Sequence, residues 1–276
     1  MGYKIVLVQC DATKSVSHRL VVAADLAQRF GARLVGLYVR RPFETSVFFD
    51  GGYATGDFFK IYGEGVEADE TRASAAFAEA TKGKELVTEW RAVDGYVESE
   101  LAVQARYADL VVVGQAGTEL TATPSDLPET TALATGRPVL VVPFIGAKSP
   151  GKVVLLCWNA SREAARAAAD ALPFLKAAQK VILLVVSPTV SAEGHGAEPG
   201  ADAAAWLARH GVKVTVQRDV GSDADVGGVI LSRAADHDAD LIVMGIYGHS
   251  RMREMVLGGA SRTLLASMTV PVFMSH

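Results

Sequence analysis

The sequence predicts an α/β protein of two similar domains, each a doubly wound, five-stranded parallel sheet with helices on both faces. Short β-branched segments alternate with Ala- and Leu-rich helical patterns, and the same order of segments occurs twice in the 276 residues. Central segments such as residues 110–113 are apolar at every position. Such runs are typical of parallel strands that are covered by helices on both sides.

Three pairs of segments carry the repeat. Residues 4–13 align without a gap with residues 152–161, and the other matching pairs are 108–114 with 239–245 and 137–142 with 270–275. A period of this length indicates a duplicated domain rather than a solenoid. We expect domains at residues 1–146 and 150–276, because the segment between them, residues 144–151, is rich in turn-forming residues.

The elements follow in the same order in both halves. In the first half, strands are expected near residues 3–9, 33–39, 86–92, 109–114 and 138–143; in the second half, they are expected near residues 152–157, 180–186, 213–218, 240–245 and 271–275. Helices are expected between them. The first covers residues 15–30, with apolar positions at helical spacing and Gly31 as its C-cap. Residues 43–65, rich in Phe, Tyr and Gly, are expected to form a long loop. Such a loop could be a lid or a second ligand site, but packing across the domains or an oligomer contact is favoured.

The composition favours a globular protein in a reducing compartment. Half of the residues are apolar, about a fifth are charged, and the net charge is -4, which does not suggest the basic surface of a nucleic-acid-binding protein. No apolar run has the length of a membrane span, and the first residues lack the pattern of a signal peptide. Cys10 and Cys157 each end a predicted strand and do not suggest a disulfide framework. We therefore expect a cytoplasmic protein without nucleic-acid partner or membrane insertion.

The segment most suggestive of function, residues 243–261, joins a predicted strand to a predicted helix. Glycines that let the backbone come close to a ligand stand near both ends of its loop, at Gly245, Gly248, Gly258 and Gly259. At the start of the following helix, free N–H groups and the helix dipole favour a phosphate. Ser261 adds a hydroxyl in the first turn, and His249, Arg251 and Arg253 add donors in the loop. This pattern predicts an anion-binding loop.

The spacing Gly245-x2-Gly248-x9-Gly258, after a strand that ends in Val-Met, resembles the nucleotide loop of the ATP-binding universal stress proteins. The likeness continues to the last strand and covers both halves. It implies a Rossmann-like fold of the adenine nucleotide alpha hydrolase type, with the terminal strands of the two halves paired about a pseudo-two-fold axis. It also implies that the second half binds an adenine nucleotide, ATP first, with or without Mg²⁺. The implied contacts are Asn159, Val186 and Met244 near the nucleoside and Gly245, Gly248, His249, Gly258, Gly259, Ala260 and Ser261 near the phosphates.

Two positions depart from the family pattern. Gly259 stands where the family has Ser or Thr, which removes a hydrogen bond worth about 1 kcal/mol. Asn159 stands where the family usually has Asp, and its amide can still bond a base or ribose without a charge. In the first half, Asp11 and the Gly114-x2-Gly117 pair remain, but Leu127 and Pro128 replace the later glycines. We expect the first half to bind no nucleotide and to serve as a structural partner.

Three functions remain open at this point. The first is a stress-response protein regulated by the nucleotide, with at most slow ATP hydrolysis, no catalytic residues and an unknown protein partner. The second is a nucleotide-free scaffold of the same fold that binds a protein. The third is an enzyme such as a transferase, which would need a base and a substrate pocket that the sequence does not reveal.

The histidines and cysteines show no metal-ligand spacing, and His249 is expected to be a surface donor. A homodimer of the tandem chain is expected.

Overall fold

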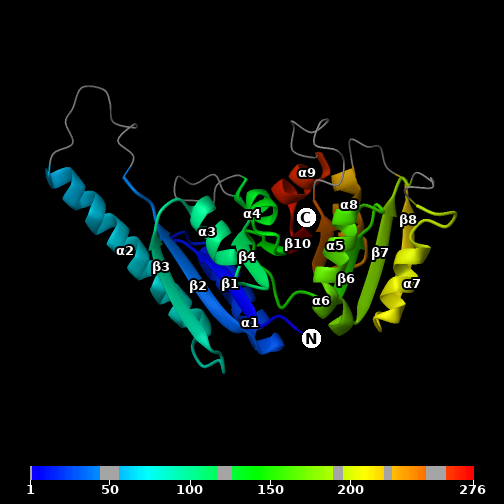
Figure 1. Ribbon diagram of the computed structural model, residues 1–276, viewed down its shortest axis with the longest axis horizontal. Coiled ribbons are helices and arrows are strands. Elements are labelled where there is room, and N and C mark those ends of the chain that lie inside the picture. Colours follow the sequence, from blue (N-terminus) through cyan, green and yellow to red (C-terminus); the bar gives the residue numbers. More distant parts are fainter. Residues whose placement is uncertain (1, 44–55, 117–125, 189–194, 221–225, 247–258) are drawn as a thin grey trace.

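The computed structural model describes residues 2–43, 56–116, 126–188, 195–220, 226–246 and 259–276. They form a single ten-stranded sheet between two layers of helices (Figure 1). The strands of the first half are β1 (Ile5–Cys10), β2 (Arg33–Arg40), β3 (Thr88–Asp94), β4 (Leu110–Gly114) and β5 (Val139–Val142). Those of the second half are β6 (Val153–Cys157), β7 (Lys180–Val186), β8 (Val214–Asp219), β9 (Leu241–Gly245) and β10 (Val272–Ser275).

The helices lie between the strands in both halves. The first half contains α1 (Val16–Phe30), α2 (Gly56–Thr81), α3 (Val97–Ala105) and α4 (Leu127–Thr135). The second half contains α5 (Arg162–Asp170), α6 (Leu172–Ala177), α7 (Ala201–Arg209), α8 (Val226–Asp236) and α9 (Gly259–Ser267). Helix α1 ends at Gly31, which has a φ of 61° and so takes the left-handed C-cap conformation that glycine favours, as predicted.

The strand order is β3-β2-β1-β4-β5-β10-β9-β6-β7-β8, so each half has the same doubly wound topology. Within each half all neighbouring strands are parallel. The exception is the junction, where β5 and β10 are antiparallel, with Val139 opposite Met274 and Val141 opposite Val272. This arrangement confirms the predicted fold and the pairing of the terminal strands, and it merges the two five-stranded sheets into one.

One sequence expectation is wrong in part. Residues 43–65 were expected to be a loop, but helix α2 already begins at Gly56; residues 44–55 lie outside the described residues. Gly63 and Gly65, which weakened the helical pattern, have no atom within 4 Å of where a Cβ would stand. The helix therefore extends through them from the Ala- and Glu-rich turns that follow, because adding a turn to an existing helix is far easier than starting one.

Two hydrophobic cores lie on opposite faces of the sheet, and each runs through both halves. One is formed with α1, α2, α5, α6 and α7, and the other with α3, α4, α8 and α9. Side chains alternate along the strands: Val6 and Val8 belong to the first core and Leu7 to the second. Helices on both faces explain why the central strands are apolar throughout.

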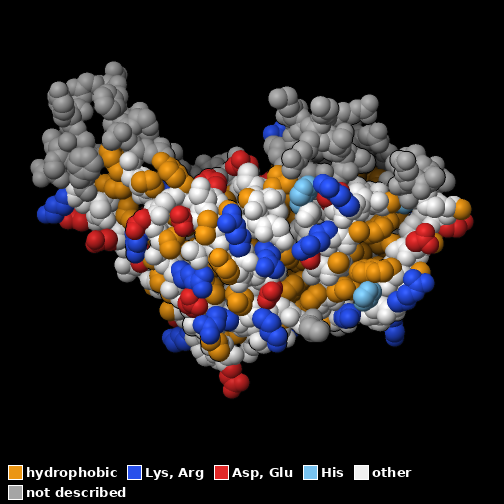
Figure 2. All heavy atoms as spheres, viewed as in Figure 1, with side chains coloured by type: hydrophobic (Ala, Val, Ile, Leu, Met, Phe, Trp, Pro, Cys, Tyr) orange, Lys and Arg blue, Asp and Glu red, His pale blue; other side chains and the backbone are white. Residues whose placement is uncertain are grey.

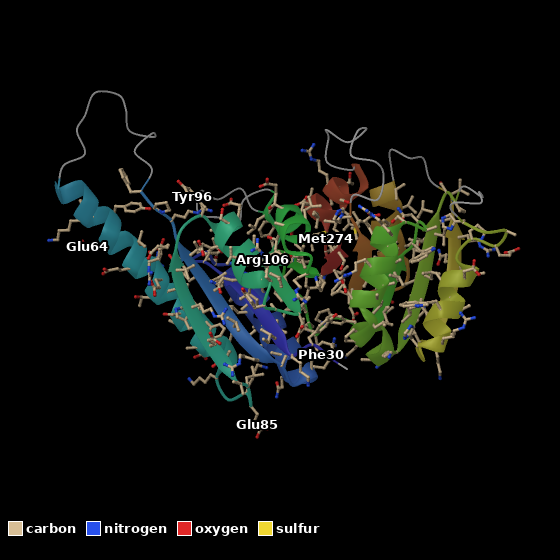
Figure 3. All side chains as sticks on the ribbon, viewed as in Figure 1. Phe30, Glu64, Glu85, Tyr96, Arg106 and Met274 are labelled. Atoms are coloured by element: carbon tan, nitrogen blue, oxygen red, sulfur yellow. The ribbon has the colours of Figure 1, made fainter. Side chains whose placement is uncertain are left out.

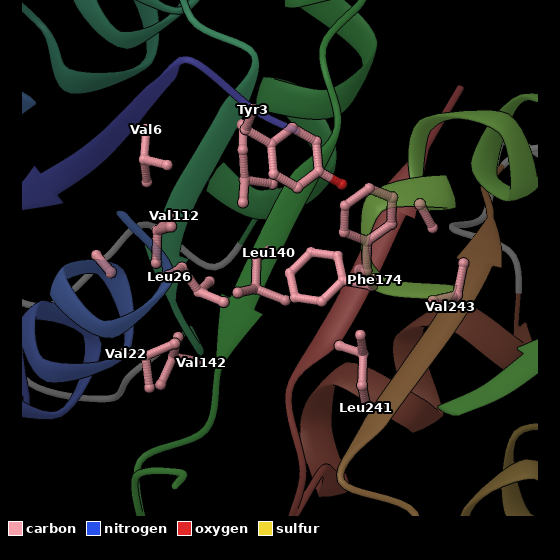
Figure 4. Close-up of a cluster of buried hydrophobic side chains, with 14 of the residues drawn as sticks. Tyr3, Val6, Val22, Leu26, Val112, Leu140, Val142, Phe174, Leu241 and Val243 are labelled. Atoms are coloured by element: carbon pink, nitrogen blue, oxygen red, sulfur yellow. The ribbon is translucent and has the colours of Figure 1, made fainter. Parts of the chain in front are cut away.

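An aromatic cluster joins the halves on the first face. Tyr3 and Phe30 of the first half pack against Phe174 of α6, with ring centroids 5.0 to 5.7 Å apart. Figure 4 shows Tyr3 beside Phe174. The Tyr3 hydroxyl donates to the backbone oxygen of Asp170 over 2.7 Å. The guanidinium of Arg29 lies 4.8 and 4.9 Å from the Phe30 and Phe174 ring centres. Figure 3 shows Phe30 at one end of the junction and Met274 near its centre.

The repeated Ala-Asp-Leu sequence has the same structural role in both halves. Asp109 accepts hydrogen bonds from the backbone N–H groups of Lys4 and Ile5, at 2.7 and 3.0 Å. Asp240 accepts bonds from those of Gly151, Lys152 and Val153, at 2.8 to 3.1 Å. Each carboxylate therefore fixes the start of the first strand of its half beside the strand that follows the aspartate.

The surface is of mixed character. On the face shown in Figure 2, basic side chains lie among acidic and hydrophobic ones. Of the helices that the structure describes, none combines the length and the apolar character that crossing a membrane requires.

Candidate functional site

The candidate site lies at the carboxyl edge of the second half, where β6, β7 and β9 end. The strand order reverses at β6, between its neighbours β7 and β9, and ligands of doubly wound sheets bind at such a point. Because β10 is parallel to β9, helix α9 must return from the carboxyl edge, so its N-terminus lies there. The same argument places the N-terminus of α5 at this edge, since β6 and β7 are parallel.

Asn159 follows β6 and is exposed. Its side-chain oxygen accepts a bond of 3.2 Å from the backbone N–H of Ser161, and the Ser161 hydroxyl caps α5 by accepting from Ala164 N at 3.1 Å. Ala160 between them has a φ of 58°, an unusual value for a residue other than glycine. The bond to Ser161 uses the side-chain oxygen of Asn159, and its amide nitrogen keeps its capacity to donate.

Val186 and Met244 border the same face of the sheet. Met244 lies in β9, is 6% exposed and belongs to the core that is formed with α3, α4, α8 and α9. Val186 ends β7, is partly buried and packs against that core. The structure therefore places both residues of the implied nucleoside pocket on the face that carries α8 and α9.

Gly245 is required for packing, a reason that the sequence did not reveal. A Cβ at this position would lie 2.4 Å from the backbone carbon of Glu163 and 2.5 Å from the nitrogen of Ala164. The first turn of α5 therefore rests directly on the end of β9. Gly245 sets how closely α5 approaches the edge and thereby fixes the place of Asn159 and Ser161.

The phosphate end of the implied site is described in part. Helix α9 begins at Gly259, and Ser261 is its third residue and partly buried, so its hydroxyl lies in the first turn as predicted. Gly248, His249 and Gly258 lie outside the described residues. Among the residues that the structure describes, no group of three or more His, Cys, Asp or Glu side chains could hold a metal ion.

The corresponding edge of the first half has different chemistry. Asp11, the counterpart of Asn159, forms an ion pair with Arg19 of α1. Arg19 is only 1% exposed. Arg19 also donates to the backbone oxygen of Gln9 over 2.7 Å, and Thr13 donates to Asp11. Burial opposes the charge of Asp11, but Arg19 and Thr13 outweigh it, so that the pKa of Asp11 is lowered.

Sequence reasoning did not single out Arg19. The gap-free alignment of residues 4–13 with 152–161, continued into the helices, gives its counterpart as Ala167 of α5, which is buried and uncharged. In the first half, a cation from the chain itself therefore satisfies the carboxylate that ends β1. In the second half, the corresponding Asn159 is exposed.

The helices at the two edges also differ. Pro128 is the second residue of α4, and Glu129 is the third, the place that Ser261 has in α9. Pro128 lacks an N–H donor. Glu129 is buried, and burial, with a contribution from Asp126, raises the pKa of its carboxyl. The first turn of α4 thus offers fewer donors to an anion than the first turn of α9.

A groove of about 440 Å³ lies elsewhere, at the outer edge of the first half between the end of β2 and α2. Arg40 on its wall pairs with Glu70 and Asp94, at 2.5 and 3.2 Å. Phe43 and Tyr62 stack edge to face with centroids 5.2 Å apart. Part of the aromatic segment thus packs locally against α2.

Comparisons with known proteins agree with this architecture. A model of the universal stress protein family matches residues 2–143 and 151–276. The structure of a universal stress protein from Archaeoglobus fulgidus DSM 4304 is similar, with a TM-score of 0.71 and 18% identity over 98% of this chain and 95% of its own. A putative universal stress protein from Pseudomonas aeruginosa UCBPP-PA14 gives a TM-score of 0.59 and 15% identity over 99% and 93%.

The comparison with curated proteins gave no match. At these identities the solved structures show the shared fold, whereas the family model covers nearly all of both halves. The chain therefore belongs to the universal stress protein family and carries two copies of the family's domain.

Proposed function

We propose that the second half binds an adenine nucleotide, ATP first, at the carboxyl edge of β6, β7 and β9, and that this binding is regulatory. The observation that carries the proposal is the placement of the α9 N-terminus at that edge, with Gly259 as its first residue and Ser261 in its first turn. The first N–H groups of a helix have no partner within the helix, and the dipole there favours negative charge. Together they would hold phosphate oxygens.

The nucleoside end of the proposed site rests on Asn159, Val186 and Met244. Asn159 offers an uncharged donor, and the two apolar residues offer a surface on one side of the sheet. The described residues contain no cluster that would hold Mg²⁺ without the nucleotide, so a magnesium ion would be held chiefly by the phosphates. We propose that any hydrolysis of ATP is slow.

We propose that the first half binds no nucleotide. Asp11 is already paired with Arg19, and the first turn of α4 combines Pro128 with the carboxylate of Glu129. Both differences oppose a phosphate or an additional nucleoside contact. The proposal therefore predicts one ligand per chain rather than two.

Calorimetry with ATP, ADP, AMP and adenosine tests the proposal. We expect one ATP per chain. Ser261→Glu, which puts a negative charge into the first turn of α9, should weaken ATP binding about tenfold or more and change adenosine binding little. The matched control is Ser17→Glu in the first turn of α1, which should leave both affinities unchanged. Failure of the wild-type protein to bind any adenine nucleotide at millimolar concentration would contradict the proposal.

A second candidate, a scaffold for a protein partner, is favoured by the exposed apolar side chains around the interdomain segment. Val21, Phe144 and Ile145 are 46%, 42% and 71% exposed, and His18, one turn before Val21, contacts the Phe144 backbone oxygen at 2.6 Å. A homodimer that buries these residues is one form of that candidate. Light scattering of the wild-type protein and of Ile145→Ser would test it, since only an interface of this kind would make the mass depend on Ile145.

A further inference from the structure

The residue after β4, Gln115, contacts the second half. Gln115 is only 7% exposed. Its side-chain nitrogen donates to the backbone oxygens of Leu265 and Ala266, at 2.9 and 3.2 Å. Its side-chain oxygen accepts from the backbone N–H of Phe144, at 3.0 Å. One buried amide thus connects the end of β4, the start of the interdomain segment and helix α9.

The two carbonyls that Gln115 binds belong to the last turn of α9. The last four carbonyls of an α-helix have no partner within the helix, so they bind water or donors from elsewhere. The chain continues after α9 with Met268 and Thr269 rather than with a capping glycine. Gln115 therefore caps α9 from the other half of the molecule.

The corresponding residue of the second half cannot do this. Gly114 and Gly245 are equivalent, so the counterpart of Gln115 is Ile246, which is fully buried and has an apolar side chain. The polar connection from the strand end to the opposite helix thus runs from the first half to α9. The half that we propose to be empty holds the helix of the half that we propose to bind the nucleotide.

We propose that Gln115 is a positioning residue for the phosphate site of the second half, a role that rests on the proposed function. Helix α9 has nine residues and is about 13 Å long, so a shift at its C-terminal end is passed to Gly259 and Ser261 at its start. Gln115 acts through the helix and not on the ligand. The first half thereby controls how firmly the second half holds phosphate.

The test compares Gln115→Met with Tyr3→Phe. Gln115→Met keeps the length of the side chain and removes its amide. Tyr3→Phe removes a single hydrogen bond between the halves, from the Tyr3 hydroxyl to Asp170, at a place away from α9. We expect Gln115→Met to weaken ATP binding about fivefold or more, the lower range of energetic coupling between sites, and to leave adenosine binding within about twofold. Tyr3→Phe should leave the ratio of the two affinities unchanged.

Hydrogen exchange of the ligand-free protein supplies a second measurement that does not depend on nucleotide binding. Gln115→Met should speed exchange of the amides in residues 263–267, and Tyr3→Phe should not. Equal losses of ATP and adenosine affinity, or unchanged exchange in α9, would overturn the positioning role. A wild-type protein that binds no adenine compound would refute the proposed function and the control of phosphate affinity, and exchange alone would then decide whether Gln115 anchors α9.

Discussion

Replacing Gly245 by alanine should damage the site without removing any group that touches a ligand. The new Cβ would stand 2.4 Å from the backbone carbon of Glu163, whereas ordinary contacts lie at 3.4 to 4 Å. The first turn of α5 would therefore have to retreat by about 1 Å, and it cannot yield as a flexible side chain would, because the opposing atoms are backbone. Overpacking of this kind costs about 1–3 kcal/mol of unfolding free energy.

The same retreat would reach the candidate site. The Cβ would also lie 2.5 Å from the nitrogen of Ala164, which donates to the Ser161 cap of α5. The Asn159 side chain bonds to Ser161, so its orientation should change as well. We expect a fall in Tm of roughly 2–12 °C, measured by circular dichroism, together with weaker adenosine binding by calorimetry.

The matched control is Gly65→Ala. Gly65 lies inside α2 with no atom within 4 Å of a Cβ, so alanine should raise the unfolding free energy by about 0.5–1 kcal/mol through helix propensity. A Gly245→Ala protein as stable as wild type, with unchanged adenosine binding, would refute the packing role that we assign to Gly245.

Four further predictions follow from buried or partly buried groups. Asp240→Ala should cost about 1–3 kcal/mol in urea unfolding, because it leaves three backbone N–H groups without their acceptor. Phe174→Ala should cost about 3–5 kcal/mol in the same assay, since the ring is fully buried at the junction. Burial raises the pKa of the Cys10 thiol to about 12, so a thiol reagent at pH 8 should modify it only after unfolding. Glu129→Gln should raise Tm at pH 7. The raised pKa of Glu129 means that the native state binds this proton more tightly than the unfolded state does. The wild-type protein therefore loses stability as the pH rises above the pKa that Glu129 has in the unfolded state, and below that pKa it loses none. The stabilisation by Glu129→Gln should therefore vanish in Tm measurements below about pH 4.

Much of the fold could be predicted because it depends on patterns that repeat within the chain. Apolar runs such as residues 110–113 can only be buried on both faces, and the Ala-Asp-Leu repeats mark equivalent strands. Ser261 could be placed in the first turn of α9 because the glycine-rich loop ends, and the helical pattern begins, just before it. The start of α2 was not predicted because the glycines and aromatic residues of its first turns are not typical of a helix. These turns continue the helix that the Ala- and Glu-rich turns after them form.

The features that the sequence did not reveal all depend on contacts between distant segments. The sequence predicted that Gly245 lets the backbone approach a ligand. Only the position of α5 shows that a side chain would not fit there. Nothing in the sequence distinguished Arg19 from other arginines in helices. The structure shows that it contacts the end of β1. The side chain of Gln115 contacts residues that follow it by 150 and 151 positions, and no local pattern predicts such a contact.

The antiparallel pairing of β5 with β10 also bears on how the two copies can evolve. In two separate chains, such a junction would form by collision, and its strength would depend on protein concentration. Here the segment between Val142 and Val153 tethers both partners, so each meets the other at a high effective concentration at any dilution. A tethered pair need not remain self-complementary. One copy can have Gln115 where the other has Ile246, a difference that two identical subunits could not have.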